Sequence, residues 1–144
     1  MQNRKLVILE SPYRGHGESD GEIAARTRWN VDYARQCLHN SILRGEAPIA
    51  SHLLYTQPGV LDDTKPEERS MGIECGLVWL PRADYSVFYT DHGWSTGMLG
   101  ALHEHNLRGG YDFKIRSLKG KSAITLPATL HEEVEQLLIN HCED

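Results

Sequence analysis

The sequence has few cysteines and no long apolar run, and each shortage excludes a class of protein. Its three cysteines, Cys37, Cys75 and Cys142, are scattered and odd in number, without the spacing of a zinc site or a disulfide framework. We therefore expect reduced thiols and a cytoplasmic protein, with Cys37 and Cys75 in the core because both fall on apolar helix faces. No stretch approaches the ~18 apolar residues of a membrane span, and residues 6–9 are too short for the core of a signal peptide.

Basic residues are also in short supply. The chain has 15 Lys and Arg against 20 Asp and Glu, a net charge of −5, whereas nucleic-acid binders usually carry a basic excess. This charge balance argues against a nucleic-acid partner. The eight histidines include no His-x-x-x-His pair, so we expect no metal, and we expect no cofactor either. A length of 144 residues, 40% of them hydrophobic and without internal repeats, suits a single domain spanning residues 1–144.

The sequence does contain an alternation of strand-like and helix-like segments. Short apolar runs predict strands at residues 6–9, 47–50, 85–89 and 113–116, with a further short one near 123–126. Helical spacing predicts helices over residues 30–44, 66–80, 98–108 and 129–142, the first capped by Asn30 and ended by Gly45. The polar residues 17–28 could be a flexible lid or an irregular approach to the first helix. The alternation predicts an α/β fold with a parallel sheet covered by helices on both faces.

Loops follow three of the predicted strands, at residues 11–17, 52–55 and 91–97, and those at 11–17 and 91–97 are polar and contain glycine. Because the carboxyl ends of parallel strands lie at one edge of a sheet, we expect these loops to converge there. Tyr13 would offer an aromatic face and Arg14 a cation, which suits a planar ring and an anionic or sugar-like group. The alternative is an ordinary polar loop.

Two further features of these loops point to a ligand. The helix beginning near Gly97 offers free backbone amides, which favour an anion or a sugar hydroxyl. Asp91 could accept hydrogen bonds from ribose hydroxyls, or it could cap its own loop.

A third interpretation is an interaction module without a small ligand, using Trp94, residues 17–28 or the C-terminal helix as a contact surface.

Several short motifs occur in a fixed order along the chain. They are Ser11-Pro12-Tyr13-Arg14-Gly15, Pro48-x-x-Ser51-His52-Leu53-Leu54, Leu61-Asp62-Asp63, Pro66-Glu67-Glu68-Arg69-x-x-Gly72, Ala83-Asp84 and Asp91-x-Gly93-x-Ser95-x-Gly97-Met98. Over residues 5–117 this set resembles the nucleoside 2-deoxyribosyltransferase-like superfamily, especially its small, often phage-borne members. The resemblance implies a Rossmann-like, flavodoxin-related three-layer fold. It also implies a nucleoside or nucleotide held by Ser11, Tyr13, Arg14, Gly15, His52, Asp91, Gly93, Ser95, Gly97 and Met98.

The resemblance also locates the chemistry, and there the chain departs from the pattern. Active members attack the anomeric carbon with a glutamate that would fall on Ala101, and their acid in the preceding helix would fall near Gly76. Glu104, one turn beyond Ala101, could act as the catalytic carboxylate, or it could be a solvated helix residue. We therefore expect ligand binding without glycosidic cleavage, for example a phage protein that sequesters a nucleotide signal. The alternative is an N-glycosidase or 2-deoxyribosyltransferase that uses Glu104. Because superfamily members often assemble, a homo-oligomer is expected.

Overall fold

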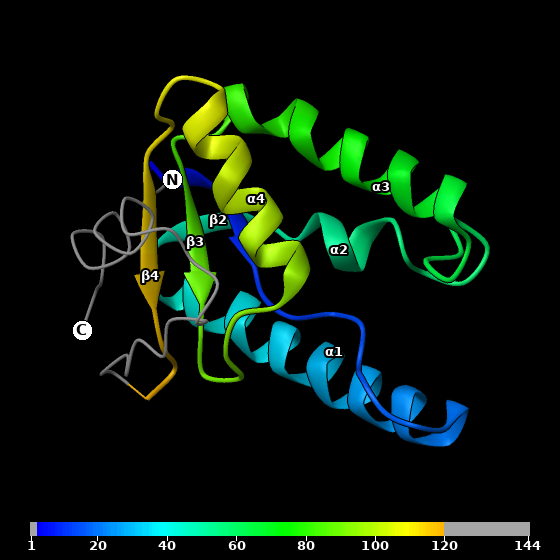
Figure 1. Cartoon of the computed structure of the whole chain (residues 1–144). Coiled ribbons are helices and arrows are strands. Elements are labelled where there is room, and N and C mark those ends of the chain that lie inside the picture. Colours follow the sequence, from blue (N-terminus) through cyan, green and yellow to red (C-terminus); the bar gives the residue numbers. More distant parts are fainter. Residues whose placement is uncertain (1–2, 120–144) are drawn as a thin grey trace.

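The structure, a computed structural model, describes residues 3–119 and has the predicted α/β architecture (Figure 1). Its elements are β1 (Lys5–Glu10), α1 (Asp20–Leu43), β2 (Glu46–Ile49), α2 (Ser51–Leu54), α3 (Pro66–Trp79), the 3-10 turn η1 (Leu80–Arg82), β3 (Tyr85–Tyr89), α4 (Thr96–Leu107) and β4 (Phe113–Arg116). All four strands are parallel, in the order β2-β1-β3-β4. The strand predicted at residues 123–126 and the helix predicted at 129–142 lie outside the described residues.

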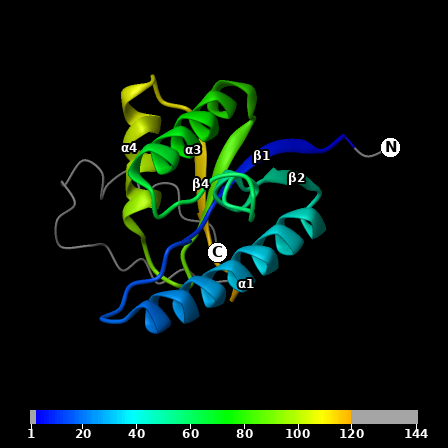
Figure 2. The same ribbon diagram turned by 90° about the vertical axis from the view of Figure 1, so that its right-hand side faces the viewer.

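The sheet is the middle of three layers, with α1 on one face and α4 on the other (Figure 2). Alternate residues of β3 show how one strand serves both faces, because successive side chains of a strand point in opposite directions. Val87 packs with Tyr33 of α1, whereas its neighbour Phe88 packs with Met98 and Leu102 of α4. This double coverage explains why the central strands are almost wholly apolar. The Rossmann-like fold expected from the sequence is confirmed.

Helix α1 begins at Asp20, well before the predicted start at Asn30. The Ser19 side chain accepts a hydrogen bond from the backbone N–H of Glu22, and the Glu22 carboxylate accepts one from the N–H of Glu18. This is a variant of the capping box, in which the carboxylate accepts from the residue before the N-cap rather than from the N-cap, and it stabilises the first turn of the helix. The prediction of a lid or irregular approach at residues 17–28 is therefore wrong for most of that segment. Asn30 lies buried in the middle of the helix and caps nothing.

Helix α3 lies where the sequence predicts it, but its apolar residues do not form a core face. None of its residues is buried, and Met71, Val78 and the thiol of Cys75 are exposed. The expectation that Cys75 is a core thiol is wrong, whereas that for Cys37 is confirmed. The reason is position, because α3 packs chiefly on α2 and η1 and extends past the end of the sheet (Figure 1).

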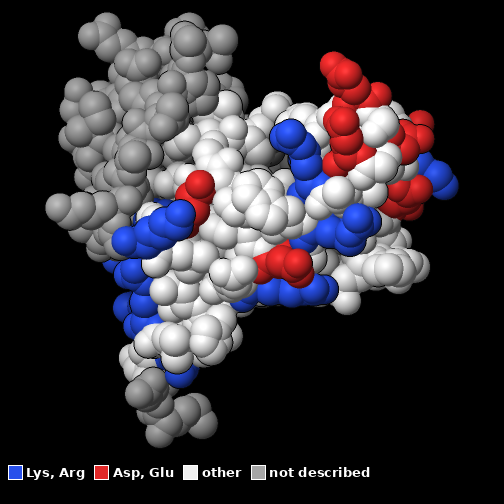
Figure 3. Space-filling view, turned by 90° about the horizontal axis from the view of Figure 1, so that it is seen from below, with Lys and Arg blue, Asp and Glu red and all other residues white. Residues whose placement is uncertain are grey.

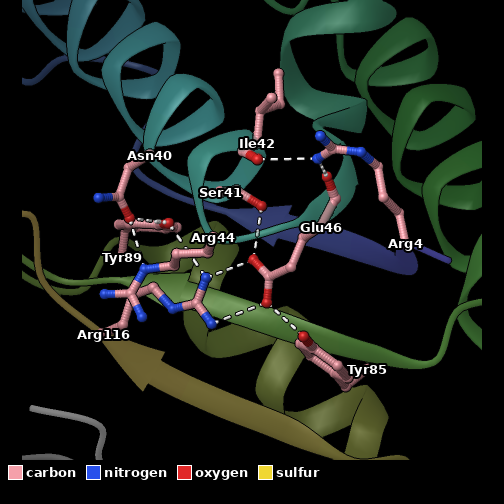
Figure 4. A network of polar contacts seen from close by, with 9 residues as sticks. All are labelled: Arg4, Asn40, Ser41, Ile42, Arg44, Glu46, Tyr85, Tyr89 and Arg116. Carbon is pink, nitrogen blue, oxygen red and sulfur yellow. Dashed lines mark hydrogen bonds and ion pairs between the residues drawn. The ribbon is translucent and has the colours of Figure 1, made fainter. Parts of the chain in front are cut away.

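A buried ion pair joins β2 to β4 beneath the end of α1 (Figure 4). The Arg116 guanidinium donates to both carboxylate oxygens of Glu46, over 2.6 and 3.0 Å. Ser41 donates to the same carboxylate over 2.8 Å, and the Tyr85 hydroxyl donates to it as well. Burial alone would raise the pKa of Glu46, but the hydrogen bonds from Arg116, Tyr85 and Ser41 outweigh burial and lower the pKa to about 2. The pair is therefore charged and fully satisfied.

Candidate functional site

A cavity of about 800 Å³ opens at the carboxyl edge of the sheet, between α3, α4 and the loop after β1. It lies where the chain changes direction across the sheet, since β1 is flanked by β2 on one side and β3 on the other. Open α/β sheets bind their ligands at this position. The volume falls in the range of roughly 300–1,000 Å³ that small-molecule sites occupy.

Each of the two helices has small residues among those that line the cavity. Gly72 and Gly76 of α3 line one side, and Gly97, Gly100 and Ala101 of α4 line another. A Cβ atom added at Gly100 would meet no atom within 4 Å, so the space beside it is open. Walls of this kind allow a flat ring to approach closely.

The structure brings most of the predicted ligand-binding residues to this cavity. Those that line it are Ser11, Tyr13, Arg14, Gly15, His52, Ser95, Gly97 and Met98, and Glu104 lines it too. Seen from the carboxyl edge, acidic side chains gather at the end of the molecule where α1 and α3 begin, and both acidic and basic side chains lie near the middle of the view (Figure 3). The convergence of the loops after β1, β2 and β3, expected from the parallel topology, is thus observed.

Asp91 and Gly93 are the predicted site residues that the structure does not bring to the cavity. The Asp91 carboxylate accepts hydrogen bonds from the Tyr33 and Ser117 hydroxyls, each over 2.5 Å, and from the backbone N–H of Leu118. Burial raises its pKa, but these hydrogen bonds outweigh burial and the net shift is downward. Asp91 therefore joins its loop to α1 and to the chain after β4, which corrects the ribose-binding expectation. Gly93, with φ +83°, shapes the same loop.

The loop after β1 is seated on α1, beside which it runs in both ribbon views (Figures 1 and 2). The backbone N–H of Gly15 donates to the Thr27 hydroxyl over 2.9 Å, and the Asn30 side chain donates to the carbonyl of Tyr13 over 3.1 Å. A Cβ atom on Gly15 would lie 2.4 Å from Cβ of Arg26, so only glycine allows this approach. The contacts with α1 fix the position from which Tyr13 lines the cavity.

Ser11 and His52 form a hydrogen-bonded pair at the end of β1, with 2.8 Å between Ser11 Oγ and His52 Nε2. The pair has the geometry of a nucleophile and its base, but two observations argue against that role. Among the described residues, Nδ1 of His52 is buried without a hydrogen-bond partner, so no carboxylate there orients the ring. Burial also lowers the pKa of His52 to about 4, which makes it a weak proton acceptor. The pair anchors α2 to β1.

Most of the charged side chains around the cavity are already paired. The pairs are Asp63 with Arg69 at 2.9 Å, Glu68 with Lys65 at 3.6 Å, and Glu104 with Arg108 at 2.9 Å. Within residues 3–119, Glu10 and Arg14 line the cavity without a hydrogen bond or ion pair from their side chains. These two groups are therefore available to a ligand.

Glu10 is a site residue that the sequence interpretation missed. It is the last residue of β1, and burial raises its pKa to about 7. The available signal was a single acidic residue closing an otherwise apolar strand. A carboxyl group with a strongly shifted pKa in a cavity is typical of functional sites.

Two other kinds of site have no basis in the part of the chain that the structure describes. There, no three or more His, Cys, Asp or Glu side chains come together in a group that could hold a metal ion. Nor does any helix there combine the length and apolar character needed to cross a bilayer.

Comparison with known proteins gives one family and no characterised relative. The model of a domain of unknown function, DUF7768, matches residues 5–111. No curated protein and no solved structure matches the chain. The family's description carries no link to nucleoside chemistry, so any function has to be argued from the cavity itself.

Proposed function

We propose that the chain, which belongs to the DUF7768 family of domains of unknown function, binds a nucleoside- or nucleotide-derived small molecule without cleaving it. The observation that carries the proposal is the presence of Tyr13, Arg14 and the first turn of α4 in one cavity of suitable volume. A tyrosine ring stacks on a base, and a guanidinium without a competing carboxylate binds a phosphate. The start of α4, capped by Ser95, adds the partial positive charge of a helix N-terminus.

The charges around the cavity limit what the ligand can be. Among the residues that the structure describes, its walls carry the carboxyl groups of Glu10, Asp63, Glu68 and Glu104 and the guanidinium groups of Arg14 and Arg69. Because Asp63, Glu68 and Glu104 are each paired with a cation, Arg14 is the guanidinium that stays available to a ligand among the described residues, which suits one anionic group better than a polyphosphate or a nucleic acid strand. The ligand that fits best is a nucleoside, or a derivative with little negative charge placed near Arg14.

Cleavage of the glycosidic bond is disfavoured because α4 has no available carboxylate at the position where the resemblance expects the nucleophile. Ala101 lines the cavity with a methyl group where the resemblance expects a nucleophile. Glu104 lines the cavity one turn further along α4, but its carboxylate is held by Arg108. A protein that keeps its ligand intact would act by sequestration, as of a nucleotide signal. Such a role suits a cytoplasmic protein, and a second copy of the chain could cover the open side of the cavity.

Gly100→Leu tests whether this cavity is the binding site. The new side chain would enter open space, so we expect about tenfold or greater loss of affinity. The fold should be retained, because removing a helical glycine stabilises by up to about 1 kcal/mol. Calorimetry with adenosine, guanosine, cytidine, uridine and their 5′-monophosphates measures the affinity.

Asn106→Leu is the matched control, because Asn106 is exposed on the same helix and does not line the cavity. It should bind the same probes as the wild type does. Failure of the wild type to bind any of them would reject the proposal. Unchanged affinity in Gly100→Leu would move the site elsewhere.

The enzymatic alternative rests on the position of Glu104 beside the cavity, one turn from Ala101. We expect no free base when the wild type is incubated with the same nucleosides and monophosphates and the products are separated by chromatography. Release of base that Glu104→Gln abolishes would establish an N-glycosidase instead. Release that survives this substitution would also reject the non-cleaving proposal, but it would exclude Glu104 as the nucleophile.

A further inference from the structure

Glu10 occupies a central position at the carboxyl edge of the sheet. It ends β1 and is in register with Phe88 of β3. Strand β1 lies between β2 and β3, at the position where the order of the strands in the sheet reverses direction. Its neighbour in the chain, Ser11, is fixed by the hydrogen bond to His52. The backbone of β1 at Glu10 is thus held by β3 and by the Ser11–His52 bond, and the Glu10 residue lines the cavity.

The environment of this carboxyl group is unusual because nothing in the described residues compensates its charge. Its oxygens take part in no hydrogen bond or ion pair within residues 3–119. Burial raises its pKa to about 7, and no neighbouring cation offsets that effect. The remaining acidic groups around the cavity, Asp63, Glu68 and Glu104, all have cationic partners. Glu10 therefore differs from them in chemistry as well as in position.

We infer that Glu10 selects the ligand as a hydrogen-bond donor, its protonated carboxyl group bonding to an uncharged acceptor such as a carbonyl oxygen or ring nitrogen of a nucleobase. This inference rests on the proposed function. A ligand that enters the cavity displaces water from Glu10 and disfavours its ionised form further. A protonated carboxyl group carries one O–H donor, which an acceptor on the ligand satisfies. Binding then takes up a proton and weakens as the pH rises.

The other titratable groups that line the cavity leave this dependence recognisable. Burial lowers the pKa of His52 to about 4 and also lowers that of His105, so both are neutral from pH 7 to 9. His16 lies on the loop after β1, close to Glu10 in the chain, and its imidazole lines the cavity too. His16→Gln is therefore the matched control.

Calorimetry with adenosine, cytidine and their 5′-monophosphates between pH 6 and pH 9 tests the inference. For the wild type we expect the dissociation constant to rise about 50-fold from pH 7 to pH 9, because only the protonated form binds. Glu10→Gln retains an N–H donor without a titrating proton, so it should bind nearly as well at pH 9 as the wild type does at pH 6. His16→Gln should keep the pH dependence of the wild type.

The possible failures are distinguishable. If none of the four probes binds the wild type at any pH, the proposed function fails and this inference fails with it. If a probe binds equally well at all pH values, or more tightly as the pH rises, the role of Glu10 is rejected while the cavity remains the site. A carbon-13 titration of the Glu10 carboxyl group in the ligand-free protein needs no variant. A midpoint near 7 supports the inference, and one near 4.5 overturns it.

Discussion

Arg116→Met is expected to lower the free energy of unfolding by about 3–5 kcal/mol, the usual cost of leaving one partner of a buried ion pair alone. Arg116 and Glu46 are 2% and 6% exposed in their side chains, so water cannot replace the lost guanidinium (Figure 4). Such a loss is a large part of the ~5–15 kcal/mol that stabilises a typical domain. Urea denaturation followed by circular dichroism measures the change.

The double substitution Glu46→Gln with Arg116→Met is the control, because it removes the buried charge as well. It should be more stable than Arg116→Met alone. The pH dependence gives a second check: the pKa of Glu46 is about 2 in the fold against an ordinary 4.5. Its contribution is therefore present above pH 4.5 and is lost as the pH falls toward 2. Arg116→Met should lose this acid-dependent component, and a destabilisation below about 1 kcal/mol would contradict the role of the pair.

Gly15→Ala is expected to destabilise the fold by about 1–3 kcal/mol, the usual cost of overpacking, and to weaken ligand binding about tenfold or more. The added methyl group would lie 2.7 Å from the carbonyl oxygen of Ile23 and 2.8 Å from the backbone nitrogen of Thr27. Helix backbone cannot yield, so the loop has to lift off α1 and carry Tyr13 and Arg14 away from the cavity. Thermal unfolding and calorimetry measure the two effects.

Gly21→Ala is the matched control, since it adds the same methyl group to α1 where the nearest atom that limits it, Oγ of Ser19, is 3.9 Å away. It should leave ligand binding unchanged and preserve or slightly raise stability. Equal behaviour of the two variants would show that the loop is not held by its contact at Gly15.

The sheet was predictable from the sequence because strands covered on both faces must be apolar throughout. The start of α1 was missed because its first turns are polar, and the signal there is the Ser19-x-x-Glu22 capping box rather than periodicity. The exposure of α3 was missed for the opposite reason. Its apolar content is that of a core helix, but a sequence does not reveal that no strand lies beneath it.

The site was predictable where topology alone decides, because loops at the ends of parallel strands must meet. It was not predictable which of several carboxylates near the strand ends lines the cavity. Glu10 ends one apolar strand and Asp91 follows another, yet Asp91 is bonded to Tyr33 and Ser117 and does not line the cavity. Such long-range partners leave no local pattern, as with Glu46 and Arg116, which are 70 residues apart.

The glycine-lined walls of α3 and α4 restrict how this pocket can change over evolutionary time. At Gly72, Gly76, Gly97 and Gly100 there is no side chain left to trim, so mutation at these positions can only reduce the space. Gly76 cannot accept even a methyl group freely, because its Cβ would lie 2.8 Å from Oγ of Ser51. A smaller cavity is thus reachable by single substitutions at these glycines, whereas a larger one requires changes elsewhere, such as shorter side chains at Leu77 or Met98.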